Sequence, residues 1–156
     1  MQLIRLRQNR GFSLIELLIV IAIMLLILMV AIPSAMNAHL NAVETVVMRE
    51  MQTIQQAQTQ YQSQFGDFAA TLAELGPPAT GHMGPAAAKL IPASLASGEK
   101  DGYLFTMSRT AAGFSVNASP KVFGSKGRRT FYLDQDGILH QNWGPEPATA
   151  SSPEIK

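Results

Sequence analysis

The residue most suggestive of chemistry is Glu16, the only ionisable side chain between Gly11 and Pro33. The surrounding run, GFSLIELLIVIAIMLLILMVAIP, is otherwise almost entirely apolar. A carboxylate at the edge of hydrocarbon is costly, so an ionisable residue in such a run indicates a function and a partner. A buried charge is tolerated when it is paired. The chemistry expected of Glu16 is therefore charge pairing in apolar surroundings.

The apolar run predicts the element that positions Glu16, a membrane-spanning helix over residues 12–33. About 20 apolar residues are enough to cross a bilayer as a helix. Three arginines precede the run, Arg5, Arg7 and Arg10. Because the basic side normally stays in the cytoplasm, the rest of the chain is expected outside it. Pro33 lacks a backbone donor, so we expect it to kink the helix.

The N-terminal sequence also resembles a known signal. The stretch GFSLIELLIV, residues 11–20, resembles the class III signal of type IV prepilins and type II secretion pseudopilins. Pro33 stands where that family also places a helix-kinking proline. The resemblance implies that a prepilin peptidase removes a leader, residues 1–11, by cutting after Gly11 and then methylates the amino group of Phe12. Gly11 suits such a position because a residue without Cβ allows close approach to its backbone.

The resemblance also gives Glu16 a partner. In the family, the glutamate of one subunit is thought to neutralise the N-terminal amine of a neighbour in the filament. Glu16 of one subunit would then pair with the amino group of Phe12 in the next. The implied partners are other pilin or pseudopilin subunits, the prepilin peptidase, the inner-membrane assembly platform and, before assembly, the lipid bilayer. The implied location is a single pass through the bacterial cytoplasmic membrane, followed by a periplasmic or cell-surface filament.

Two simpler interpretations explain less of this segment. An ordinary signal peptide places its cleavage site after the apolar region, at an A-x-A-like triplet, and none follows the run cleanly. A plain membrane anchor explains the apolar run but leaves Glu16 and the Gly11–Phe12 junction without a reason.

Residues 34–66 are predicted to continue the helix with one apolar stripe. Apolar residues recur there at intervals of three, four or seven, which is the helical period: Met36, Leu40, Val43, Val47, Met51, Ile54, Tyr61 and Phe65. We expect this stripe to pack on a sheet. Glu44 is expected to fall outside this stripe, and the glutamine run from Gln52 to Gln64 is expected on a solvated or subunit-facing surface. Gly66 is a natural helix C-cap.

Residues 67–101 are predicted to be a connecting region rich in alanine, glycine and proline. Thr71 and Glu74 have the spacing of a capping box for a short helix, Leu72–Leu75. A further helical turn is expected over residues 85–90.

Residues 102–143 are predicted to form a four-stranded antiparallel sheet. The expected strands cover residues 102–108, 113–118, 129–133 and 138–142, and residues 134–137 (DQDG) are typical of a tight hairpin. Residues 144–156 are expected to be a flexible, frayed tail. Together with the long helix, these elements predict an α+β pilin fold.

The composition excludes several classes of function. The chain has no cysteine, hence no disulfide and no thiolate site, and its net charge is +1. No nucleophile or phosphate-loop motif occurs, and His39, His82 and His140 are widely spaced. We therefore predict a protein that is a substrate of an enzyme, is not itself an enzyme, and needs no cofactor.

Two short segments suggest additional sites. Asp134 and Asp136 look like part of a calcium loop, but the further oxygen ligands and the bidentate glutamate do not follow, which favours a hairpin. A basic loop, with Lys121, Lys126, Arg128 and Arg129, is the candidate for contact with nucleic acid phosphates, but it lacks aromatic residues at suitable positions, which favours an ordinary solvated loop.

The leading hypothesis is a structural subunit of a type IV pilus or of a type II secretion pseudopilus. The sequence leaves these two open, although the missing cysteines lean towards a pseudopilin or a simple disulfide-free pilin. The alternative is a minor pilin that acts in DNA uptake or adhesion through the basic loop.

Overall fold

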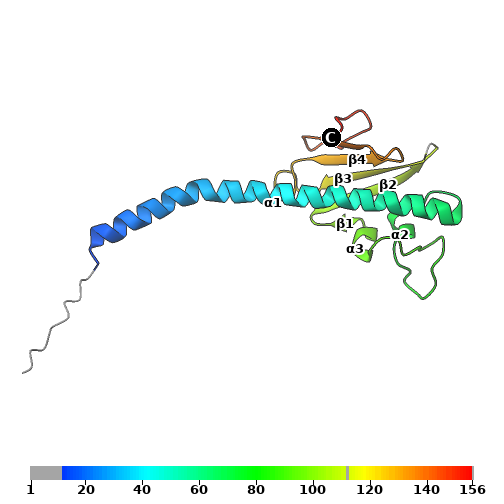
Figure 1. The fold of residues 1–156 in the computed structure, drawn as a ribbon, viewed down its shortest axis with the longest axis horizontal. Helices are drawn as coiled ribbons and strands as arrows, with labels where there is room; N and C mark the ends of the chain where they lie inside the picture. Colours follow the sequence, from blue (N-terminus) through cyan, green and yellow to red (C-terminus); the bar gives the residue numbers. More distant parts are fainter. Residues whose placement is uncertain (1–11, 112, 156) are drawn as a thin grey trace, which may run out of the picture. The chain divides into compact units, whose positions relative to one another are not determined.

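The computed structural model describes residues 12–111 and 113–155, so the leader and Gly11 lie outside the described residues. The elements, in chain order, are α1 (Leu14–Phe65), α2 (Leu72–Leu75), α3 (Ala93–Ala96), β1 (Glu99–Lys100), β2 (Tyr103–Thr110), β3 (Gly113–Pro120), β4 (Thr130–Asp134) and β5 (Leu139–Asn142) (Figure 1). The chain divides into two compact units between Ala38 and His39, within α1.

The first unit is a helix without a core of its own. Every residue from Phe12 to Ala38 is exposed, because no other described residue of the unit covers this helix. The helix continues through Pro33. The kink expected at Pro33 remains a prediction.

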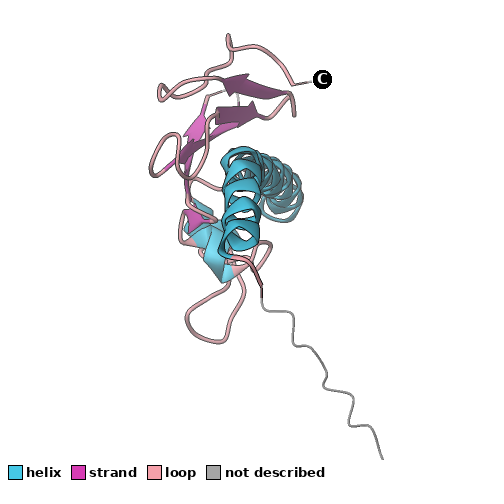
Figure 2. Ribbon diagram, turned by 90° about the vertical axis from the view of Figure 1, so that its left-hand side faces the viewer, coloured by secondary structure: helices cyan, strands magenta, loops and turns pink. Residues whose placement is uncertain are grey.

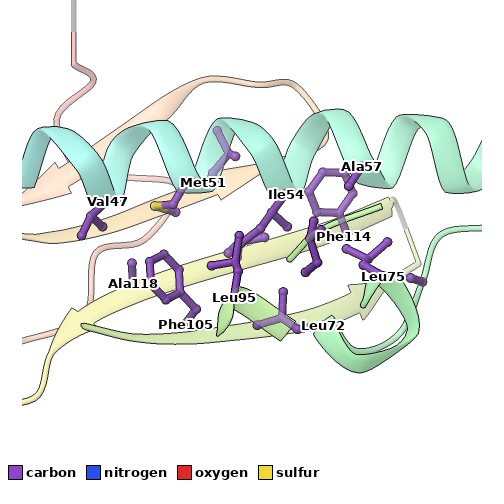
Figure 3. Packing of buried hydrophobic residues seen from close by; sticks show 14 of the residues in the cluster. Val47, Met51, Ile54, Ala57, Leu72, Leu75, Leu95, Phe105, Phe114 and Ala118 are labelled. Atoms are coloured by element: carbon purple, nitrogen blue, oxygen red, sulfur yellow. The ribbon is translucent and has the colours of Figure 1, made fainter. Parts of the chain in front are cut away.

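The second unit is built on the amphipathic part of α1. Of the predicted stripe, five residues are buried: Leu40, Val47, Met51, Ile54 and Tyr61. Val43 is half-buried, whereas Met36 and Phe65 are exposed. Figure 3 shows the stripe facing the aromatic and aliphatic side chains of the strands, with leucines of the connecting region beside them.

The sheet is an antiparallel meander in the order β1-β2-β3-β4-β5. Alternate residues face the core, as the pairs Phe105–Ala118 and Val116–Leu133 show. The helix lies against one face of this sheet (Figure 2). The α+β prediction is confirmed, and the four predicted strands correspond to β2–β5. The predicted number of strands was one too low, because β1 has only two residues and is too short to produce an alternating pattern in the sequence.

The connecting region confirms one of its two predicted helical segments. The helix α2 has the expected bounds, and the Thr71 hydroxyl accepts a hydrogen bond from the Glu74 amide at 3.4 Å. The prediction of a helical turn over residues 85–90 was wrong. The Leu90 amide donates instead to the Leu75 carbonyl at 2.8 Å, so this segment pairs with the end of α2, and the next helix is α3.

Residues 144–155 also differ from the expected frayed tail. The chain returns along β5, where the Gln141 amide donates to the Pro153 carbonyl at 2.9 Å and the Ile155 amide donates to the Leu139 carbonyl at 2.8 Å. Ala148 is buried. The segment therefore covers the outer edge of the sheet, which would otherwise offer unpaired backbone groups.

A buried glutamine joins α1 to the connecting region. The Gln58 side-chain amide donates to the Ala69 carbonyl and accepts from the Ala69 amide, each at 2.9 Å. Gln58 is fully buried, contrary to the solvated or subunit-facing surface expected for the glutamine run. It lies four residues after Ile54 and three before Tyr61, and its position on the stripe therefore explains its burial.

Replacing Gln58 by leucine is expected to lower the free energy of unfolding by about 1–3 kcal/mol, because both buried backbone groups of Ala69 lose their partner. Urea unfolding of the full chain in detergent, followed by circular dichroism, measures this change. Gln56→Leu is the matched control, because Gln56 is exposed on the same helix. Equal unfolding midpoints for the two variants would contradict the assignment.

Candidate functional site

The predicted cleavage and assembly residues that the structure describes lie together at the beginning of α1. Phe12 is 85 % exposed. The amides of Glu16 and Leu17 donate to the Ser13 carbonyl at 3.1 and 3.2 Å, which closes the first helical turn. Glu16 therefore lies in the first turn, where the positive end of the helix dipole favours a carboxylate.

A continuous apolar surface follows Glu16. Among residues 12–111 and 113–155, one helix is long and apolar enough to cross a membrane by length and composition. Its most apolar window has a mean hydropathy of 3.2 and contains no buried residue. Such a surface needs lipid or other apolar helices around it. The described part of the site thus combines the exposed Phe12, a single carboxylate and an uncovered apolar helix.

A second polar site, which the sequence analysis missed, is centred on Glu44. This residue is fully buried in α1. Its carboxylate accepts the Arg129 Nε–H at 2.8 Å through one oxygen and the Arg128 backbone N–H at 2.7 Å through the other. Glu44 follows Leu40 by four residues and precedes Val47 by three, so the helical period alone could have placed it on the buried stripe.

The Arg129 side chain is held from several sides. Its Nη1 donates to the Gln141 side chain at 2.8 Å, and its guanidinium lies 5.0 Å from the centre of the Trp143 ring. The Tyr103 hydroxyl donates to the Arg129 carbonyl at 3.0 Å. Burial, and to a smaller extent the Glu44 carboxylate, raise the pKa of that hydroxyl. These contacts attach the β3–β4 connection to α1. The role of this polar site is therefore to stabilise the fold.

The predicted basic patch is distributed among different partners. Lys121 forms an ion pair with Glu99 at 2.7 Å, and Arg129 binds Glu44. Arg128 donates from Nη2 to the Asn41 side chain at 2.6 Å. Lys126 is exposed. The nucleic acid patch remains a prediction, and two of its four cations point towards α1.

The aspartates of the calcium candidate form the expected hairpin. The Asp134 carboxylate accepts the Asp136 amide at 3.1 Å, and the Gly137 amide donates to the Asp134 carbonyl at 3.1 Å. This turn joins β4 to β5. Within residues 12–111 and 113–155, no group of three or more histidine, cysteine, aspartate or glutamate side chains could hold a metal ion.

The comparisons concern the N-terminal segment. Residues 6–32 match the family model described as the prokaryotic N-terminal methylation motif, which is the signature of type IV pilins and pseudopilins. No curated protein and no solved structure gives a significant match.

The chain is therefore an α+β protein whose long apolar N-terminal helix carries a processing motif. Over residues 6–32 it bears the type IV pilin and pseudopilin signature, as the sequence analysis predicted, and this motif supports a pilin-like substrate of a prepilin peptidase. The matched segment contains Gly11, Phe12 and Glu16.

Proposed function

We propose that this protein is a structural subunit of a type IV pilus or of a type II secretion pseudopilus. In this role it is cut after Gly11, methylated at Phe12, and assembled into a helical filament through the apolar part of α1. The observation that carries the proposal is the exposed apolar helix with Glu16 in its first turn, inside the methylation motif.

The apolar helix supports both stages of this function. Before assembly, lipid would surround the exposed side chains from Leu14 to Ile32. In a filament, equivalent helices of other subunits would replace the lipid. A helix that is apolar on all sides suits both surroundings because it makes no demand for a polar partner except at Glu16.

The position of Glu16 supports pairing with a neighbouring chain start. Cleavage after Gly11 would create a positive amine at Phe12, beside the positive end of the helix dipole of α1, where a cation is disfavoured. A carboxylate from a neighbour would offset this charge in apolar surroundings. Because the pair forms in only one axial position, it would also set the spacing between subunits.

The arginines before the apolar run support a location of the second unit outside the cytoplasm. The second unit has a complete core and its own buried ion pair, so its fold does not depend on the first unit for either. In the proposed topology residues 1–11 face the cytoplasm, and residues 39–155 lie on the opposite side of the membrane.

Intact mass of the chain from its own membranes tests the processing step. We expect a chain that starts at Phe12 and carries one added methyl group, whereas a variant with a bulky residue in place of Gly11 should keep its leader. An uncut wild-type chain, or one cut beyond Ile32, would contradict the proposal.

A further inference from the structure

The β3–β4 connection presents an apolar tip to solvent. Val122 is 56 % exposed and Phe123 is 43 % exposed. Backbone bonds hold the tip in shape, because the Gly124 amide donates to the Gly127 carbonyl at 2.7 Å and the Lys126 amide donates to the Val122 carbonyl at 2.9 Å. Apolar side chains kept in water on a folded tip indicate a contact surface.

Trp143 lies at the same end of the sheet. In the β4–β5 ladder Thr130 is opposite Asn142, so Trp143 comes next to Arg129, the last residue of the β3–β4 connection. Trp143 is 64 % exposed and is the only tryptophan of the chain. We call Val122, Phe123, Lys126 and Trp143 the tip surface.

The tip surface is tied to the beginning of the second unit. The Arg128 side chain binds Asn41, and Glu44 binds the neighbouring Arg129. Asn41 follows Pro33, the end of the apolar run, by only eight residues. That length spans about 12 Å as a helix and no more than about 28 Å when fully extended. The length of chain therefore sets an upper limit on the distance between Asn41 and the end of the apolar run, and this limit allows the tip surface to reach a bilayer that holds the run.

The residue types of the tip surface suit the boundary between water and hydrocarbon. Tryptophan and other aromatic side chains gather at that level because the ring is apolar but can carry a polar group. Lys126 can extend its ammonium to lipid phosphates while its stem stays among apolar groups. The turn at the opposite end of the sheet, between β4 and β5, combines the polar residues Gln135 and Asp136 with a single exposed apolar residue, Ile138.

We propose that the tip surface contacts the phospholipid headgroup region while the subunit is held in the membrane. The contact would orient the second unit before assembly, and the unit would lose it when the subunit enters a filament. This inference rests on the membrane-held stage of the proposed function, and its partner is a lipid surface.

Fluorescence of Trp143 tests the inference directly. The full chain is reconstituted into vesicles of phosphatidylethanolamine and phosphatidylglycerol that contain lipids brominated close to the headgroup. We expect these lipids to quench Trp143. In a Val122→Ser, Phe123→Ser variant the quenching should fall about two-fold or more, because the tip no longer holds the ring at the headgroup boundary.

Ile138→Ser is the matched control, because Ile138 is an exposed apolar residue in the β4–β5 turn. It should leave the quenching unchanged. Emission that aqueous acrylamide quenches but brominated lipid does not would overturn the inference. Emission that changes with the protein-to-lipid ratio would also overturn the inference, because it indicates contact with a second copy of the chain. Emission that responds only to added DNA would overturn it as well.

Flotation of the same vesicles separates the two levels of the proposal. A chain that floats with the lipid but shows no lipid quenching overturns the tip contact alone. A chain that does not float overturns the membrane-held stage, and the tip contact with it.

Discussion

Replacing Glu44 by alanine is expected to lower the free energy of unfolding by about 3–5 kcal/mol, because it leaves Arg129 as a largely buried charge without its carboxylate. The Arg128 backbone N–H loses its acceptor in the same variant. A loss of this size is comparable to the whole stability of a small domain. Urea unfolding of the full chain in detergent, followed by circular dichroism, measures it.

Two further variants isolate the cause of this loss. The exposed ion pair of Lys121 with Glu99 is the matched control, and Glu99→Ala should cost less than about 1 kcal/mol. Replacing Glu44 and Arg129 together by methionine should recover much of the stability, because no unpaired charge is then buried. Equal costs for Glu44→Ala and Glu99→Ala would contradict the account of the buried pair.

Replacing Glu16 by valine is expected to leave processing intact and to reduce the amount of filament at least about tenfold. The reason is that the amine of Phe12 would lose its partner in apolar surroundings, where an unpaired charge costs several kcal/mol and each 1.4 kcal/mol corresponds to about a factor of ten. Immunoblotting of sheared filaments against total chain measures assembly, and intact mass measures cleavage.

Ile15→Val is the control for this experiment, since it changes the adjacent position without altering charge. Normal amounts of filament with Glu16→Val would show that the carboxylate does not set assembly. A chain that also stays uncut would place Glu16 in recognition by the peptidase instead.

Much of the fold follows from local patterns in the sequence. Alternation and turn residues located β2–β5 to within about two residues, and Thr71 with Glu74 located α2. The motif at Glu16 was recognised from ten consecutive residues, and the family model confirms it. These features were predictable because the information for each lies within one short segment.

The features that sequence analysis missed depend on partners in other elements of the fold. Glu44 is buried because Arg129, 85 residues away, neutralises it. Gln58 is buried because Ala69 offers a donor and an acceptor at the correct separation. Residue type suggested water for both, and their place on the apolar stripe is the only local signal that they face the core.

The return along β5 was missed for a related reason. Residues 144–155 are rich in proline, alanine and serine, which is typical of an exposed tail. The segment itself contributes mainly backbone groups to its contacts with Leu139, Gln141 and the side chains of Thr130 and His140, and backbone groups leave no trace in its side-chain composition.

Glu44 and Gln58 together have a mechanical consequence for the second unit. They lie about 21 Å apart along α1, with apolar stripe residues between them. The stripe repeats every turn, so on its own it would tolerate a slide of α1 by one turn against the sheet. Glu44 and Gln58 oppose that slide, because it would leave the buried carboxylate of Glu44 and the buried amide of Gln58 without their partners. A force that pulls on α1 is therefore transmitted through Glu44 to the β3–β4 connection and through Gln58 to the connecting region.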